Sequence, residues 1–348
     1  MRNTTLVFIA MTVWASGCGG DPAPEMGKSD PSTVRRDDSS PHALPTGRVN
    51  LPTRYAERCD VRTPLGGGRH ERTIVVRPGG RLSVERRYDV YIPRWLPRGE
   101  SVPLVFYLHP LLTDRLYLQR VGVQALADRE GFIAVFPQGL GKSWNGGACC
   151  GPANGVGSDA PAVDDVGFIR AVLADVQAVA CVDRRRVYAT GFSNGGFLAH
   201  RLGCEASDLF AAIAPVAAVN GMPPERCNPR HPVAVLAING TADQLAPFDG
   251  GFSFEGITRG AFISAERSTQ MWAKLDGCRS ATSSASDNSG LSCTIYDQCA
   301  GGVQVTLCAI RGAGHCWYGE PSCVFGPNSR IVDATEETWA FLKQYRRR

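Results

Sequence analysis

The segment 186–204 constrains the fold of this chain more than any other. Residues 186–190 have the composition of a strand and residues 195–204 that of an apolar helix. Between them lies the turn Gly191-Phe192-Ser193-Asn194-Gly195-Gly196. Its glycines lack a Cβ, and so they permit the strained backbone and close packing that a direct strand-to-helix reversal requires. The segment therefore predicts a strand, a tight turn and a helix of a layered α/β fold.

Strand-like and helical stretches alternate over the rest of the chain. Strand-like runs occupy residues 84–92, 103–108, 133–136, 186–190 and 233–239. Several of them are near-continuous apolar runs, typical of central strands covered on both faces. Helical spacing of apolar side chains predicts helices over residues 165–180, 195–204, 266–275 and 334–345, the first capped by Asp164 or Asp165. We expect an exposed loop at the Ser-rich residues 280–289. The alternation predicts an α/β domain with a mostly parallel sheet.

The amino-terminal residues predict export. Arg2 precedes a short apolar run over residues 6–14, and Ala15-Ser16-Gly17-Cys18 resembles the lipobox of bacterial lipoprotein signals. We expect residues 1–18 to form such a signal, with lipidation at Cys18 anchoring an outer-membrane or cell-surface lipoprotein. An ordinary secretory signal cleaved nearby is the alternative, and it would give an extracellular protein. Residues 19–54, rich in Pro, Ser, Gly and Asp, predict a flexible tether ahead of a folded domain over residues 55–348.

Cysteine usage agrees with export. Of 13 cysteines, twelve remain without Cys18, an even number that predicts up to six disulfides in an oxidising compartment. Zinc is the rival interpretation, but no CxxC pair occurs and histidines are sparse. Strands expected at residues 294–297 and 304–310, joined at residues 300–302, would place Cys293 opposite Cys308. We expect three pairs: Cys204 with Cys227, Cys293 with Cys308, and Cys316 with Cys323.

The overall composition is that of a globular protein without a strong charge preference. Of 348 residues, 43% are hydrophobic and 20% charged, which excludes collagen-like, coiled-coil and wholly disordered chains. The formal net charge of +4 is too weak to indicate a nucleic-acid partner. The basic residues Arg346, Arg347 and Arg348 are expected to be the frayed end of the last helix.

Ser193 lies where a strand-turn-helix elbow presents a nucleophile, at a helix amino end that favours developing negative charge. A serine hydroxyl needs a base to attack at neutral pH, and in this architecture the base follows the serine in the chain. Only His231 and His315 follow at a distance that allows a return to the site. His231 precedes a buried strand and so lies at its wrong end, whereas His315 lies in a Gly-rich loop after a strand. We therefore predict His315 as the base.

The acid that orients the base is expected in a loop after a strand, between the serine and the histidine. Asp243 follows the apolar run at residues 233–239, and Asp249 is the runner-up. Other aspartates in the interval lack this strand context: Asp208, Asp276, Asp287 and Asp297. The predicted role of Asp243 is to orient His315 and to stabilise the imidazolium.

Five segments carry a family resemblance over residues 85–345. They are Ser143-Trp144-Asn145 with Cys149-Cys150-Gly151, Val163-Asp164-Asp165-Val166-Gly167-Phe168-Ile169, the Ser193 turn, Asn239-Gly240-Thr241-Ala242-Asp243 and Gly312-Ala313-Gly314-His315-Cys316-Trp317. In this order they resemble the secreted polyhydroxybutyrate depolymerase and feruloyl esterase group of α/β-hydrolases. The resemblance implies an α/β-hydrolase fold, with helices on both faces of a mostly parallel sheet. It also implies a serine esterase that needs no cofactor or metal and acts on polyhydroxyalkanoate-type, feruloyl or acetyl polysaccharide esters.

One loop departs from the family's pattern, in which His-Gly follows the strand before the oxyanion loop. Here the residues are His109-Pro110-Leu111-Leu112. Because Pro110 has no N–H, the oxyanion hole is expected to use the amide of Asn194 with that of Leu111 or Leu112.

Four further side chains are candidates for structural roles. His109 and His200 are expected to be packed, hydrogen-bonded residues rather than bases. Trp144 and Trp317 either line a substrate-binding cleft or fill the core.

The sequence therefore predicts an exported serine esterase with the triad Ser193, Asp243 and His315. Its expected partners are an ester substrate and a membrane reached through Cys18, with no nucleic acid. Two other classes stay open. One is a surface binding protein that retains the fold but has lost catalysis, which the altered residues 109–112 would favour. The other is a serine peptidase on the same scaffold.

Overall fold

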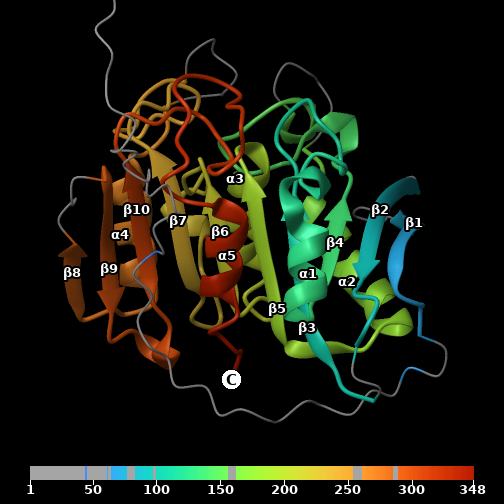
Figure 1. The fold of residues 1–348 in the computed structure, drawn as a ribbon. Helices are drawn as coiled ribbons and strands as arrows, with labels where there is room; N and C mark the ends of the chain where they lie inside the picture. The colour runs from blue at the N-terminus through green and yellow to red at the C-terminus, as the bar shows by residue number, and fades with distance from the viewer. Residues whose placement is uncertain are drawn as a thin grey trace, which may run out of the picture. The chain divides into compact units, whose positions relative to one another are not determined.

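One twisted sheet organises the fold (Figure 1). Over the described residues it has 10 strands in the order β1-β2-β4-β3-β5-β6-β7-β10-β9-β8. The strands are β1 (Gly68–Val76), β2 (Val84–Ile92), β3 (Val102–Leu108), β4 (Ile133–Pro137), β5 (Val182–Phe192), β6 (Ala212–Val216), β7 (Ala234–Gly240), β8 (Ser280–Ser284), β9 (Leu291–Asp297) and β10 (Val305–Ile310). The block from β4 to β10 is parallel, and antiparallel strands complete both edges. The predicted mostly parallel sheet is confirmed.

The computed structural model describes residues 44, 61, 64–76, 83–96, 99–155, 162–253, 261–284 and 289–348. These belong to one compact unit over residues 40–348. The predicted signal at residues 1–18, its Cys18, and the predicted tether at residues 19–54 lie outside the described residues, apart from Leu44. Leu44 is buried, and its amide donates to the carboxylate of Glu337 at 3.0 Å. Among the described helices, none has the length and apolar character needed to cross a bilayer.

Helices cover both faces of the sheet (Figure 1). One face packs against α1 (Gln124–Glu130) and α5 (Ala334–Leu342). The other packs against α2 (Asp165–Val179), α3 (Asn194–Glu205) and α4 (Ala265–Leu275). Because both faces are covered, central strands such as β3 and β7 are buried along their whole length. This explains the continuous apolar runs that predicted them.

Several elements of the structure differ from those predicted from the sequence. Residues 280–284 of the expected Ser-rich loop form the edge strand β8, which pairs with β9. Its side chains are mostly exposed, so backbone pairing rather than apolar burial places it in the sheet. The edge strand β1, the short strand β6 and the helix α1 were not predicted.

Disulfides link segments around the sheet. All three predicted pairs are present: Cys204–Cys227, Cys293–Cys308 and Cys316–Cys323. Cys293 and Cys308 are cross-strand partners of β9 and β10, as the predicted hairpin requires. The structure adds Cys149–Cys150 and Cys278–Cys299, and Cys181 is also disulfide-bonded. The fold is therefore held together by disulfides as well as by its core.

Candidate active site

Ser193 lies in a tight turn between β5 and α3. Its backbone has φ 55° and ψ −123°, a left-handed φ that only a rigid surrounding structure maintains in a residue with a Cβ. A Cβ at Gly195 would lie 2.0 Å from the Leu108 carbonyl oxygen, so only glycine fits beneath the turn. The Ser193 amide donates to the Val216 carbonyl at 2.9 Å, which fixes the turn against β6. The half-buried Ser193 side chain stands before the first turn of α3.

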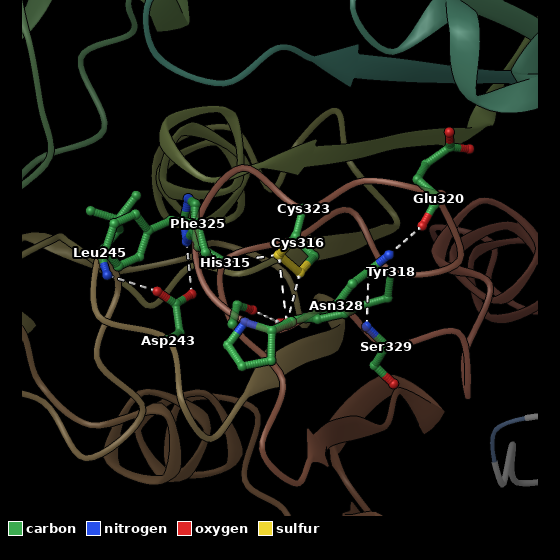
Figure 2. Close-up of a disulfide and its surroundings, with 12 residues drawn as sticks. Asp243, Leu245, His315, Cys316, Tyr318, Glu320, Cys323, Phe325, Asn328 and Ser329 are labelled. Atoms are coloured by element: carbon green, nitrogen blue, oxygen red, sulfur yellow. Dashed lines mark hydrogen bonds and ion pairs between the residues drawn. A yellow bond between two sulfur atoms is a disulfide. The ribbon is translucent and has the colours of Figure 1, made fainter. Parts of the chain in front are cut away.

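Asp243 and His315 come from loops that follow neighbouring parallel strands. The ends of β7 and β10 are in register, Gly240 opposite Ile310, so their loops leave the same edge of the sheet. The Nδ1 atom of His315 lies 2.7 Å from the Oδ2 atom of Asp243 (Figure 2). Both side chains are buried, with 2% and 0% exposure. The structure thus brings the predicted base and acid into a direct hydrogen bond.

Backbone amides hold the Asp243 carboxylate in place. Its Oδ1 atom accepts from the amides of Leu245 and Ala246, each at 2.8 Å (Figure 2 shows the first). Oδ2 is thereby left for the imidazole. Since the carboxylate accepts from Nδ1–H, the Nε2 atom of His315 carries a lone pair in the neutral ring and is able to take a proton.

The imidazole also lies against the elbow. Its ring centroid is 5.0 Å from that of Phe192, the residue directly before Ser193. The alternatives considered from sequence are elsewhere: His231 is exposed at the amino end of β7, and Asp249 is exposed. Of the candidate bases and acids, His315 and Asp243 are the ones that the fold brings to the elbow.

Asn194 joins the elbow to the segment 143–150. Its side-chain oxygen accepts from the Trp144 amide at 2.6 Å, and its side-chain nitrogen donates to the Trp144 carbonyl at 2.9 Å. The same nitrogen lies 3.6 Å from the sulfur of Cys149. These side-chain contacts hold Asn194, the first residue of α3, in one position.

Of the two roles predicted for Trp144 and Trp317, lining a substrate cleft or filling the core, their burial favours the core. Trp144 is 0% exposed and donates its indole N–H to the His109 carbonyl at 2.9 Å. Trp317 is 2% exposed and donates to the hydroxyl of Thr335 at 2.9 Å. Both rings pack within the hydrophobic core.

His109 orders the loop after β3. Its Nε2 atom accepts from the Gly139 amide at 2.9 Å, and its Nδ1 lies 2.8 Å from the Pro110 carbonyl, to which it donates. Burial lowers its pKa to about 4, so the ring is neutral and structural, as expected. His200 is likewise buried: its Nδ1 atom accepts from the Trp272 indole at 3.0 Å, and burial lowers its pKa to about 3.

The two leucine amides of this loop differ. The Leu112 amide donates to the Lys142 carbonyl at 2.8 Å, so it is already used. The Leu111 amide has no hydrogen-bond partner within the described part of the chain. Leu112 has φ 62° and a side chain that is 72% exposed.

Two ion pairs with buried aspartates support these loops, and the sequence did not reveal them. Asp165 pairs with Arg86 at 2.8 Å and accepts the Asn145 amide at 2.8 Å, which ties α2 to the segment that contacts Asn194. Asp89 pairs with Arg115 at 3.0 Å, just after the leucine loop. The available signal was an acidic residue inside an apolar stretch, since a buried charge requires a partner.

Asp164 is the N-cap of α2, and its carboxylate accepts from the Gly167 amide at 2.8 Å. The predicted cap is therefore confirmed, and Asp165 has a different role from its neighbour.

The chain is similar in sequence and in fold to known esterases. No protein-family model matches the chain. It is 33% identical over 242 residues to feruloyl esterase B of Piromyces equi, covering 66% of this chain but only 42% of that protein. It is 32% identical over 256 residues to the putative esterase NocK of Nocardia uniformis subsp. tsuyamanensis, covering 69% of this chain and 71% of that protein.

Among solved structures, a thermostable esterase aligns with a TM-score of 0.51 and 16% identity, covering 80% of this chain and 63% of that one. At this identity the likeness shows the fold alone. The two sequence relatives, at 33% and 32% identity, also show the family. The chain belongs to the feruloyl esterase-like group of α/β-hydrolases, an esterase family.

Proposed function

We propose that the chain is an exported serine carboxylic-ester hydrolase with the triad Ser193, His315 and Asp243. The observation that carries this proposal is the buried 2.7 Å hydrogen bond between His315 and Asp243, beside a strained elbow that presents a serine. Esterase relatives support the reaction class.

In this mechanism Ser193 Oγ attacks the ester carbonyl while His315 Nε2 takes its proton. Asp243 holds the Nδ1–H tautomer and stabilises the imidazolium that forms. The imidazolium then protonates the departing alcohol and leaves an acyl-serine. Water, deprotonated by the same imidazole, hydrolyses the acyl-enzyme and regenerates Ser193.

The oxyanion of each tetrahedral intermediate would rest on backbone amides. Asn194 supplies one at the amino end of α3, where the helix dipole favours negative charge. Leu111 supplies the other, because the Leu112 amide is already bonded to Lys142. Of the two leucines that the sequence left open, the hydrogen-bond pattern favours Leu111.

The proposed substrates are esters with an apolar or aromatic acyl group, of the polyhydroxyalkanoate or the feruloyl and acetyl polysaccharide kind. Large apolar side chains are exposed on loops after the parallel strands: Leu112 at 72%, Leu140 at 41% and Val324 at 54%. Such side chains suit contact with an apolar acyl group. The name of the Piromyces equi relative, feruloyl esterase B, agrees with a phenolic acyl group.

Export is the remaining part of the proposal. Disulfides form and persist in oxidising compartments, and the five described pairs support a protein that works outside the cytosol. The lipobox-like residues Ala15-Ser16-Gly17-Cys18 support a lipid anchor at Cys18. Mass spectrometry of the mature amino terminus would reveal either a diacylglyceryl-modified Cys18 or a different, unmodified end.

The test is hydrolysis of p-nitrophenyl acetate, p-nitrophenyl butyrate and methyl ferulate by the oxidised chain and by Ser193→Ala. We expect turnover in the wild type and a loss of about 10³-fold or more in Ser193→Ala. A fluorophosphonate should label the wild type at Ser193. Folded protein without turnover or labelling would instead indicate a binding protein, and cleavage of peptide amides would indicate a peptidase.

A further inference from the structure

His315 lies near the start of a long irregular segment. Residues 311–333 run from the end of β10 to the start of α5 without a regular helix or strand. Segments of this length have many accessible backbone conformations, and ordering them costs conformational entropy. A base in such a segment needs restraints beyond its one hydrogen bond to Asp243.

Apolar burial supplies little restraint on the second half of this segment, residues 321–330, which returns toward α5 and is called the returning half below. Residues 321–330 are mostly exposed, and Val324 is 54% exposed. In contrast, residues 313–318 in the first half are buried, and the exposed fraction is 0% for Cys316 and 2% for Trp317. The returning half is therefore held by specific bonds rather than by the core.

Those bonds converge on His315. Its amide donates to the Phe325 carbonyl at 2.7 Å, and its carbonyl accepts from the amides of Val324 at 3.2 Å and Phe325 at 3.3 Å. The preceding Gly314 amide donates to the Pro327 carbonyl at 2.7 Å. The returning half thus clamps both sides of the His315 backbone.

A disulfide closes this clamp directly beside the base. Cys316, the next residue after His315, is bonded to Cys323, the residue before Val324 (Figure 2). The sulfurs of Cys316 and Cys323 lie 3.5 Å and 3.7 Å from the Pro327 carbonyl oxygen. The covalent bridge therefore fixes the two chain halves at the level of the hydrogen bonds that hold His315.

We propose that the Cys316–Cys323 disulfide is a positioning element for His315, whose main contribution is to catalytic geometry rather than to global stability. The inference rests on the proposed role of His315 as the base. The bridge spans a sequence separation of only 7, against 21 for Cys278–Cys299. In the chain-entropy model a shorter closed loop stabilises the folded state less. Opening the bridge removes the covalent restraint from the returning half and lets the imidazole leave its place against Asp243 and Phe192.

The test compares Cys316→Ser/Cys323→Ser with Cys278→Ser/Cys299→Ser in the full chain. The second pair joins the region before β8 to that after β9. It lies near the amino ends of the parallel strands, whereas the site lies at their carboxyl ends, so it is a matched control. We expect the first variant to lose at least tenfold in kcat on p-nitrophenyl acetate and in the rate of fluorophosphonate labelling, with KM within twofold of wild type. The control should keep kcat within twofold and lose more Tm than the first variant.

Two results would overturn the inference: a folded Cys316→Ser/Cys323→Ser chain with wild-type kcat, or equal losses of kcat in both variants. If this variant does not fold, wild-type protein opened by a phosphine reductant and mapped by alkylation and mass spectrometry serves instead. Activity should fall in step with opening of Cys316–Cys323, and activity that persists after opening contradicts the proposal. A wild type that neither hydrolyses esters nor labels overturns the proposed function itself, and this inference with it.

Discussion

Ser193 has a strained backbone conformation. A left-handed φ in a residue with a Cβ costs about 1–3 kcal/mol, and the close packing of Gly191 and Gly195 maintains it. The benefit is a hydroxyl placed directly before the first turn of α3. His315 and Asp243, by contrast, are buried and unstrained in φ, so their precision depends on hydrogen bonds.

Replacing one oxygen of Asp243 by an amide nitrogen tests its hydrogen bond with His315. Asp243→Asn removes the charge that stabilises the imidazolium and allows the wrong tautomer, so we expect kcat to fall by about 10³–10⁴-fold. Steady-state hydrolysis of p-nitrophenyl acetate measures this loss. Asp249→Asn, at an exposed aspartate on the same loop, should stay within twofold of wild type. A larger loss in Asp249→Asn would move the acid to that residue.

At the level of elements, the amino end of α2 shows how neighbouring aspartates differ. Asp164 caps the helix in an exposed position, whereas Asp165 is fully buried with Arg86. The Arg86 guanidinium stacks 3.8 Å from the Phe168 ring centroid. Asp165 also accepts the Asn145 amide, so α2, β2 and the segment 143–150 meet at one carboxylate. Sequence periodicity identified the helix but could not distinguish these roles.

This difference predicts unequal costs of substitution. Asp165→Asn leaves the buried Arg86 without its charge partner, and we expect a loss of about 3–5 kcal/mol in the free energy of unfolding. Asp164→Ala removes only a cap and should cost about 1 kcal/mol. Urea unfolding of both variants measures the two values. Equal losses would show that the ion pair contributes no more than the cap.

At the scale of the whole molecule, a buried carboxyl far from the site couples stability to pH. Asp276 ends α4, is 1% exposed, and accepts the Val233 amide at 3.1 Å through Oδ1. Its Oδ2 atom has no partner among the described residues. Burial raises its pKa from 3.8 to about 7. Between these values the folded protein holds a proton that the unfolded chain has released, so the free energy of unfolding falls as pH rises.

Asp276→Asn should remove this dependence. An amide keeps the acceptor for Val233 and carries no charge, so we expect the variant to have a higher Tm than wild type at pH 8. Below about pH 4, the difference in Tm between variant and wild type should no longer change with pH. Thermal unfolding across pH 4–8 measures it, with the exposed Asp249→Asn as control. A wild type and variant whose Tm curves run parallel over this range would contradict the assignment.

Sequence alone determined the elements and chemistry that are local. Three features follow from spacing over a few residues: the turn at residues 191–196, the apolar runs of the central strands and the cross-strand Cys293–Cys308 pair. Spacing also predicted a cap at Asp164 or Asp165, of which the structure selects Asp164. Chain order and strand context also selected Asp243 and His315, and the fold places these two in contact. Their catalytic roles stay a prediction until Ser193 and Asp243 are substituted.

Only the tertiary structure decided what depends on burial and on distant partners. It placed Trp144 and Trp317 in the core, assigned the Leu112 amide to Lys142 and paired Asp165 with Arg86. It also made the Ser-rich residues 280–284 an edge strand, because backbone pairing with β9 needs no apolar pattern. The physical reason is common to these cases: burial and hydrogen bonding are set by residues tens of positions away, and local periodicity does not contain that information.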